Sequence, residues 1–220
     1  MSSLIGDIVA REAQLLGVAL SSSEIDAFER YAMELKKWNS KINLTAITKD
    51  REIAIKHFID SLHLAPYLST GDRLLDIGSG AGLPVLPLKI IRPEISMVSV
   101  DAVAKKIHFQ RHIIRLLDLK NIKAVHARIE ELHKAELNSF TVIISRAFTR
   151  LDRFVALASP FLAEGGVLIA MKGEQAECEI SASDSSLQAG GFTVVSTQRY
   201  VLPENMGERV LTVLKSCKAP

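Results

Sequence analysis

Three glycines at every second position follow an acid in the stretch from Asp76 to Gly82, which reads DIGSGAG. The apolar run before Asp76 predicts a strand, and bare backbone after a strand lets a ligand approach the carboxyl end of a sheet. The spacing is GxGxG, whereas the dinucleotide fingerprint GxGxxG has its third glycine where this chain has Leu83. Asp76 would be badly placed beside a pyrophosphate but can hold a ligand's amino group, directly or through water. The stretch therefore favours an amine-bearing ligand without a phosphate.

Two further acids follow the next two predicted strands. Asp101 ends the run MVSVD, where a carboxylate can accept both hydroxyls of a ribose, and Glu130 lies in HARIEEL, where an adenine could sit. Together with Asp76 they describe a nucleoside that carries an amino acid, which is S-adenosylmethionine. Two alternatives stay open: the glycines only make a tight turn while Asp101 caps the next helix, or the chain is an NAD(P) enzyme.

The loop after the fourth predicted strand, ISRAFTRL, bears on which atom would be methylated. It has neither the (D/N)PP(Y/F) clamp for exocyclic amines nor a nearby Cys for pyrimidine carbon-5. A ring nitrogen with a lone pair, such as guanine N7, needs alignment but no base. Small-molecule methyltransferases also lack both motifs, so they remain an alternative. Arg146 ends a wholly apolar and therefore central strand, so its guanidinium should reach the site mouth and align a base.

A basic cluster occupies the segment from Ala102 to Leu117, which contains no acid. Its cations are Lys105, Lys106, Arg111 and Arg115. On a helix Lys105, His108, His112 and Arg115 share one face, and Phe109, Ile113 and Leu117 face the other way. The basic face could meet RNA phosphates or could simply be solvated. His108 and His112 lack a third ligand, so we predict no metal site.

The residues before about position 70 are predicted to form an N-terminal helical region. Ile25, Phe28, Tyr31 and Leu35 form an apolar stripe preceded by SSSE, where a Ser can cap the helix and Glu24 can lie in its first turn. A second helix is predicted from about residue 50 to 64. The segment KWNSKINLTAITKD between them is predicted to be irregular, because it is polar. Its Trp38 should anchor this region to the rest of the chain, although it could instead stack a base.

Residues 71–220 alternate short apolar runs with segments of helical length, which predicts an α/β fold with a mostly parallel sheet. The runs FTVVSTQRYVL and ERVLTVLKS are separated only by PENMG, so they should form an antiparallel hairpin at the sheet edge. We therefore expect a Rossmann-like domain at 71–220 of the class I S-adenosylmethionine-dependent methyltransferase type, after a helical region at 1–70.

Composition narrows the protein class further. Lys and Arg number 27 against 25 acids, so only a local cluster can argue for a polyanionic partner. Cys178 and Cys217 stand far apart and form no recognisable disulfide framework or zinc motif. The N-terminus lacks the apolar core of a signal peptide, and no run approaches a membrane span. We expect a monomeric cytoplasmic protein without a membrane partner.

Several longer stretches resemble those of a bacterial family. KWNSKINLT, HFIDSL, DIGSGAGLPVLPL, SRAF, MKG and GERVLTVLK occur in the order seen in the small-subunit rRNA methyltransferase G family, also called glucose-inhibited division protein B. The resemblance implies an enzyme that transfers methyl from S-adenosylmethionine to N7 of guanosine 527 in 16S rRNA. The implied partner is the 30S ribosomal subunit or its assembly intermediate. A non-enzymatic RNA-binding assembly factor with the same fold remains an alternative.

The resemblance also implies roles for individual residues. Cofactor contacts would fall on Gly78, Leu83, Asp101, Ile129, Glu130 and Arg146, and to these we add the neighbouring Gly80 and Ala102. Candidate substrate or lid residues are Asn43, His57, Asp60, Lys172 and Arg209. For His57, packing between the two regions is the alternative.

Overall fold

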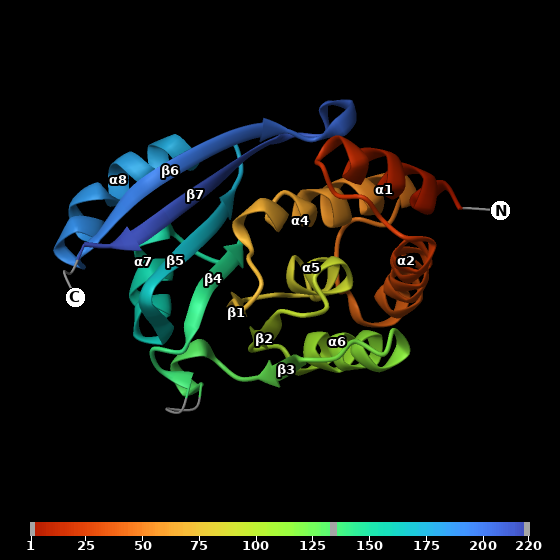
Figure 1. Cartoon of the computed structure of the whole chain (residues 1–220), viewed down its shortest axis with the longest axis horizontal. Coiled ribbons are helices and arrows are strands. Elements are labelled where there is room, and N and C mark those ends of the chain that lie inside the picture. Colours follow the sequence, from red (N-terminus) through yellow and green to blue (C-terminus); the bar gives the residue numbers. More distant parts are fainter. Residues whose placement is uncertain (1–2, 133–135, 218–220) are drawn as a thin grey trace.

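A seven-stranded sheet with strand order β3-β2-β1-β4-β5-β7-β6 forms the centre of the molecule (Figure 1). The computed structural model describes residues 3–132 and 136–217. The strands are β1 (Arg73–Ile77), β2 (Ser96–Asp101), β3 (Ile122–His126), β4 (Phe140–Arg146), β5 (Leu162–Lys172), β6 (Phe192–Val201) and β7 (Glu208–Ser216). Pairing is parallel from β3 to β5, and β7 pairs antiparallel with both β5 and β6. The predicted mostly parallel sheet with a C-terminal edge hairpin is confirmed.

Helices cover both faces of the sheet (Figure 1). They are α1 (Leu4–Leu15), α2 (Ser22–Ile42), α3 (Asp50–Ile53), α4 (Asp60–Leu62), α5 (Val85–Ile91), α6 (Ala104–Leu116), α7 (Leu151–Ala158) and α8 (Ala176–Ala189). Single π or 3-10 turns are η1 (Ala54–Ile59), η2 (Ala65–Tyr67), η3 (Ile129–Glu131), η5 (Ser159–Phe161) and η6 (Pro203–Asn205). Within the described ranges, no helix has the length and apolar character needed to cross a membrane.

The period of two along each strand sorts the sheet residues into two apolar clusters. Leu74, Met97 and Val142 belong to the apolar cluster that includes α5 and the N-terminal helices such as α2. Their neighbours Leu75 and Val98 belong to the cluster that includes α7 and α8. The same alternation decides which way the strand ends face. Asp76, Asp101 and Arg146 have the parity of the first cluster, so they lie on the face that the N-terminal helices cover.

The N-terminal region follows the sequence prediction except at the end of α2. Ser21 and Glu24 form the expected reciprocal capping box. The prediction that KWNSKINLTAITKD is irregular was wrong for its first six residues, because α2 continues to Ile42 and ends at Asn43, which has a positive φ of 50°. Trp38 and Ile42 extend the helix because they continue its apolar contact with the core. The proposed division at residue 70 stays a prediction, since one apolar cluster contains residues from both sides.

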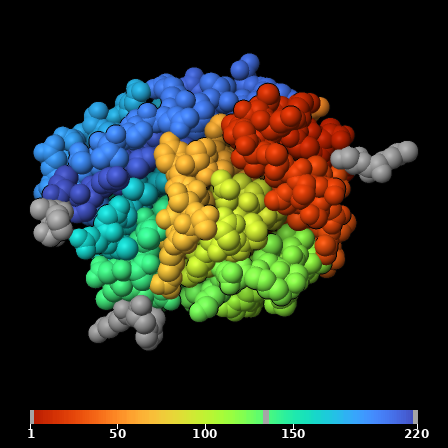
Figure 2. All heavy atoms as spheres, in the orientation of Figure 1, coloured from red at the N-terminus to blue at the C-terminus, as the bar shows by residue number. Residues whose placement is uncertain are grey.

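Residues 50–62 form one helical segment, in which the π turn η1 separates the short α-helices α3 and α4. A π turn inserts an extra residue per turn and so rotates the following side chains, and such turns occur often at functional sites. Here η1 carries His57, and Asp60 begins the next turn. In Figure 2 this segment, drawn in orange, lies between the red N-terminal helices and the teal and blue C-terminal strands. It therefore connects the two halves of the chain.

Candidate functional site

The glycine loop after β1 is held open by hydrogen bonds to its backbone. Gly78, Gly80 and Gly82 have φ values of 74°, 60° and 91°, a region that only glycine enters readily. The Gly80 N–H donates to Asp101 Oδ2 at 2.8 Å, and Nε2 of the fully buried Gln110 donates to the Gly80 carbonyl at 2.8 Å. From α2, the Tyr31 hydroxyl donates to the Ala81 carbonyl at 2.6 Å. The loop conformation is therefore fixed from β2, α6 and α2 together.

Two buried carboxyl groups lie beside this loop. Asp101 is 7% exposed, and its second oxygen accepts from the Val103 N–H at 2.8 Å. Asp76 is fully buried; one oxygen accepts from the Val85 N–H at 3.3 Å, and Oδ1 has no hydrogen-bond partner within residues 3–132 and 136–217. Burial raises the pKa of Asp76 well above its ordinary value. A buried polar atom without a partner is costly, so Oδ1 indicates that a polar ligand or water belongs here.

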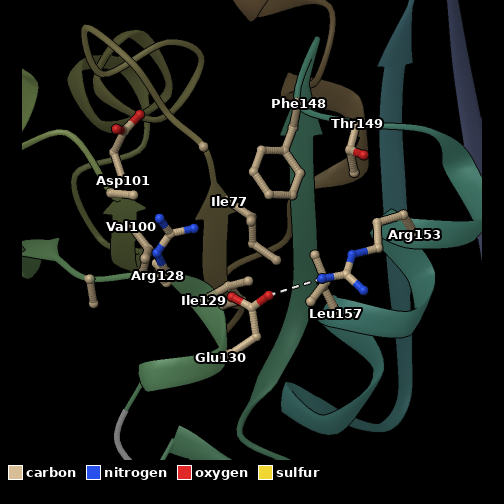
Figure 3. A pocket seen from close by; sticks show the side chains of 13 residues that line it. Ile77, Val100, Asp101, Arg128, Ile129, Glu130, Phe148, Thr149, Arg153 and Leu157 are labelled. Atoms are coloured by element: carbon tan, nitrogen blue, oxygen red, sulfur yellow. Dashed lines mark hydrogen bonds and ion pairs between the residues drawn. The ribbon is translucent and has the colours of Figure 1, made fainter.

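A cavity of about 280 Å³ opens at the carboxyl ends of β1, β2 and β3 (Figure 3). We call it the glycine cavity; it is lined by Ile77, Gly78, Val100, Asp101, Ala102, Ala127, Arg128, Ile129, Glu130, Phe148, Thr149, Arg153 and Leu157. Glu130 is held at its mouth by an ion pair with Arg153, 3.1 Å long. Apart from Gly80 itself and its two chain neighbours, no described residue has a heavy atom within 4 Å of the position that a Cβ at Gly80 would take. The backbone there is open to a ligand.

Five of the eight predicted cofactor residues lie together in the structure, and the other three lie elsewhere. Gly78, Asp101, Ala102, Ile129 and Glu130 line the glycine cavity together. Gly80 borders it through its bond to Asp101, Leu83 is buried in the apolar cluster under the N-terminal helices, and Arg146 lines a different cavity. The cofactor roles of all eight stay predictions.

That second cavity, of about 330 Å³, contains most of the predicted substrate residues. We call it the arginine cavity; it is lined by Ile47, Lys56, His57, Asp60, Arg146, Ala147, Met171, Lys172, Gly173 and Arg209. Asn43, the residue that follows the last turn of α2, is the predicted substrate residue that does not line this cavity. Lys172 turns to the α8 face, where its Nζ donates to the Thr149 carbonyl at 2.5 Å and to Glu179 at 2.8 Å.

Asp60 organises the arginine cavity although it is only 2% exposed. Its Oδ1 accepts from the Tyr200 hydroxyl at 2.8 Å. Its Oδ2 lies 3.4 Å from Arg146 Nη1 and 3.5 Å from Arg209 Nε. Arg146 also donates to the Lys56 carbonyl at 3.1 Å. Asp60 is therefore buried and paired with both guanidinium groups, and its predicted substrate role stays a prediction.

His57 is 5% exposed and lies on the turn that precedes Asp60. Its Nε2 lies 3.0 Å from the Thr45 hydroxyl, and its Nδ1 lies 3.3 Å from the Lys56 carbonyl. Burial, and then the nearby Arg146 charge, lower the pKa of His57 to about 3. The imidazole is therefore neutral at physiological pH, and its contacts tie residues 45–47 to η1.

Trp38 lies on α2 and packs against α6. Its ring centroid is 5.6 Å from that of Phe109 and 5.1 Å from that of His112, which confirms the predicted anchor. His112 also bonds to the buried Glu34 at 2.7 Å, so it belongs to this interface and not to an exposed basic face. Lys105, His108, Arg111 and Arg115 are exposed. In the described part of the chain no three His, Cys, Asp or Glu residues are grouped as metal ligands.

Among the site residues that the sequence analysis missed are Phe148, Arg153 and Tyr200. Phe148 lies within the SRAF stretch, so its place after a central strand was an available signal. Arg153 on α7 and Tyr200 on β6 reach the site only through tertiary contacts with Glu130 and Asp60, and no local pattern marks them.

Sequence comparisons show which known proteins this chain resembles. A family model described as "rRNA small subunit methyltransferase G" matches residues 24–206. The chain is 47% identical over 210 residues to "Ribosomal RNA small subunit methyltransferase G" of Geobacter sulfurreducens, covering 96% of this chain and 97% of the relative. It is 44% identical over 215 residues to the protein of the same name from Geotalea uraniireducens, covering 98% of each.

Solved structures share the fold at low sequence identity. A SAM-dependent methyltransferase from Aquifex aeolicus aligns with a TM-score of 0.59 at 14% identity, covering 83% of this chain and 97% of that one. A TYW2 protein from M. jannaschii, solved with AdoMet, aligns with a TM-score of 0.55 at 14% identity over 92% of this chain and 80% of that one. The predicted class I methyltransferase fold is confirmed.

The low pKa of His57 gives a testable pH dependence. Its folded pKa of about 3 lies below the ordinary value of 6.5, so between these values the unfolded chain binds a proton that the folded chain does not. The stabilisation from His57 is complete above about pH 6.5 and is lost as the pH falls toward 3. Between about pH 7 and pH 5, the wild type should lose roughly 2 kcal/mol more unfolding free energy than His57→Gln.

Urea unfolding at several pH values measures this difference. His108→Gln, at an exposed position of α6, is the control and should follow the wild-type profile. Parallel profiles for wild type and His57→Gln would contradict the prediction.

Proposed function

This chain belongs to the rRNA small subunit methyltransferase G family, and from that premise we propose that it transfers methyl from S-adenosylmethionine to N7 of guanosine 527 in the 530 loop of 16S rRNA. The observation that carries the proposal is the adjacency of two unlike cavities at the carboxyl ends of the central strands. In the glycine cavity two carboxylates and bare backbone lie beside two guanidinium groups, whereas the arginine cavity has four cationic side chains and the single carboxylate of Asp60. The first suits a nucleoside with an amino acid, and the second suits RNA.

The residues of the glycine cavity fit S-adenosylmethionine. Asp101 would accept ribose hydroxyls, since each carboxylate oxygen has a lone pair left after its bond to Gly80 or Val103. Glu130 would lie beside the adenine. Asp76 does not line this cavity, but its oxygen without a partner suits a polar group near the glycine loop. When bound, the cofactor supplies an electrophilic methyl group on a sulfonium. The TYW2 protein from M. jannaschii, which shares the fold, was solved in complex with AdoMet, and this supports the same choice here.

The arginine cavity suits an RNA nucleotide whose N7 is the nucleophile. Guanine N7 carries a lone pair and no proton, so the transfer needs no general base. The neutral His57 agrees with this requirement, because a pKa of about 3 makes it a poor base at physiological pH. Arg146 would hold the base through O6, as guanidinium groups do in guanine recognition. Two guanidinium groups share one carboxylate in this cavity, so positive charge remains for the phosphates.

Methylation of purified 30S subunits tests the proposal. Subunits from a strain that lacks the gene would be incubated with the protein and radiolabelled S-adenosylmethionine, and N7-methylguanosine would be mapped by borohydride and aniline cleavage. We expect label at guanosine 527. Label on nucleosides or free amines but not on 30S subunits would indicate the small-molecule alternative. Binding of RNA without transfer and without cofactor binding would indicate an assembly factor.

Asp101→Ala should weaken S-adenosylmethionine binding. The variant removes an ionised acceptor from a site built to pair hydroxyls, and it frees the Gly80 N–H as well. The expected cost is about 1 to 3 kcal/mol, which is roughly a 5-fold to 150-fold increase in Kd. Calorimetry measures it, with Asp118→Ala in the exposed loop after α6 as the control. An unchanged Kd for Asp101→Ala would remove this residue from the cofactor site.

Arg146→Lys should slow methyl transfer on the order of tenfold or more while the fold is kept. A lysine preserves the charge but cannot reproduce the planar, bidentate geometry that aligns a base. Single-turnover methylation of 30S subunits at saturating cofactor measures the effect. Arg199→Lys, in an exposed ion pair on β6, is the matched control and should be unchanged. A wild-type rate for Arg146→Lys would refute the aligning role.

A further inference from the structure

The phenyl ring of Phe148 lies directly against the glycine loop. A Cβ atom built at Gly78 would lie 2.4 Å from Cδ2 of Phe148, closer than real contacts allow, so the ring packs on bare backbone. Figure 3 shows the ring pointing into the glycine cavity near Ile77 and Thr149. Phe148 is nevertheless 37% exposed as a whole residue. One part of the ring is therefore fixed against the protein while another part remains free for a ligand.

Phe148 also lies where the cavities adjoin. Beside the arginine cavity is an open cavity of about 610 Å³, the outer cavity, lined by Ala147, Phe148, Thr149, Lys172, Gly173, Glu174, Gln175, Ala176, Glu179 and Arg209. Phe148 and Thr149 line both the glycine cavity and the outer cavity. Ala147 lines both the outer cavity and the arginine cavity. A ligand group that moves from the arginine cavity or the outer cavity toward the glycine loop therefore passes the ring of Phe148.

The backbone conformation directs adjacent side chains to different cavities. Ala147 has a positive φ of 50°, which is unfavourable for a residue with a Cβ and occurs often at functional sites. Arg146 before it turns to Asp60 in the arginine cavity, and Phe148 after it turns to Gly78. The left-handed residue thus allows a guanidinium and an aromatic ring to stand side by side at the end of one strand.

We propose that Phe148 is the stacking surface that positions the target base, an inference that rests on the proposed function. A base taken out of its stack is usually held by aromatic or apolar side chains, because these replace the lost stacking. The cations Arg146, Arg209 and Lys172 line the adjoining cavities and would face the negatively charged backbone of the same nucleotide. The ring fixes the plane of the base, and Arg146 fixes its rotation within that plane.

Four variants at one position test the proposal, with cofactor affinity and transfer rate measured separately. Phe148→Ala should lower the single-turnover rate on 30S subunits on the order of 100-fold, with the Kd for S-adenosylmethionine within about threefold of wild type. Phe148→Leu keeps apolar volume without a π face and should remain at least tenfold slow. Phe148→Tyr and Phe148→Trp should recover the rate to within about threefold. Val195→Ala, at an exposed apolar position on β6, is the control.

Each other outcome overturns the inference. A wild-type rate for Phe148→Leu means that volume, not stacking, is what matters. A loss of cofactor affinity equal to the loss of rate assigns Phe148 to the cofactor site alone, and a large gain in affinity for Phe148→Ala means that the ring blocks that site. When one of these outcomes occurs and the wild type labels 30S subunits in the same assay, the inference fails and the proposed function stands. If the wild type labels none, the proposed function fails and the inference falls with it.

Discussion

The buried carboxylate of Asp60 joins three parts of the chain that are far apart in sequence. It comes from the helical segment before the sheet, and it pairs with Arg146 at the end of β4, Arg209 on β7 and Tyr200 on β6. A carboxylate that is 2% exposed is costly without partners, so the fold must bring these groups to it. Both guanidinium groups then point into one cavity. The N-terminal helices and the carboxyl edge of the sheet thus behave as one unit.

Much of this arrangement follows from local sequence patterns. The period of two in the strands places Asp76, Asp101 and Arg146 on one face, and the glycines at every second position fix the loop that meets them. The short PENMG connection was sufficient to predict the edge hairpin. The apolar run that ends at Arg146 was sufficient to predict a central strand, because only such a strand is covered on both faces.

The remainder depends on contacts that no local pattern records. The sequence marked Asp60 as a candidate substrate residue, but it did not reveal that this carboxylate is buried and has partners on β4, β6 and β7. The helix α2 continues through the polar residues up to Ile42, because Trp38 packs on α6. The predicted cofactor residues also divide between two cavities, since Arg146 turns toward Asp60 instead of toward the glycine loop. The burial of Asp60, the end of α2 and the direction of Arg146 all depend on tertiary contacts with residues far away in the sequence.

A double-mutant cycle between Asp60 and Arg146 tests most directly whether this carboxylate joins the two regions. The unfolding free energies of Asp60→Asn, Arg146→Gln and the double variant would be measured by urea titration against the wild type. We expect a coupling energy of about 1 to 3 kcal/mol, because Asp60→Asn leaves Arg146 without a carboxylate and Arg146→Gln leaves the buried Asp60 with Arg209 as its charged partner. Additive effects, with a coupling energy below about 0.3 kcal/mol, would contradict it.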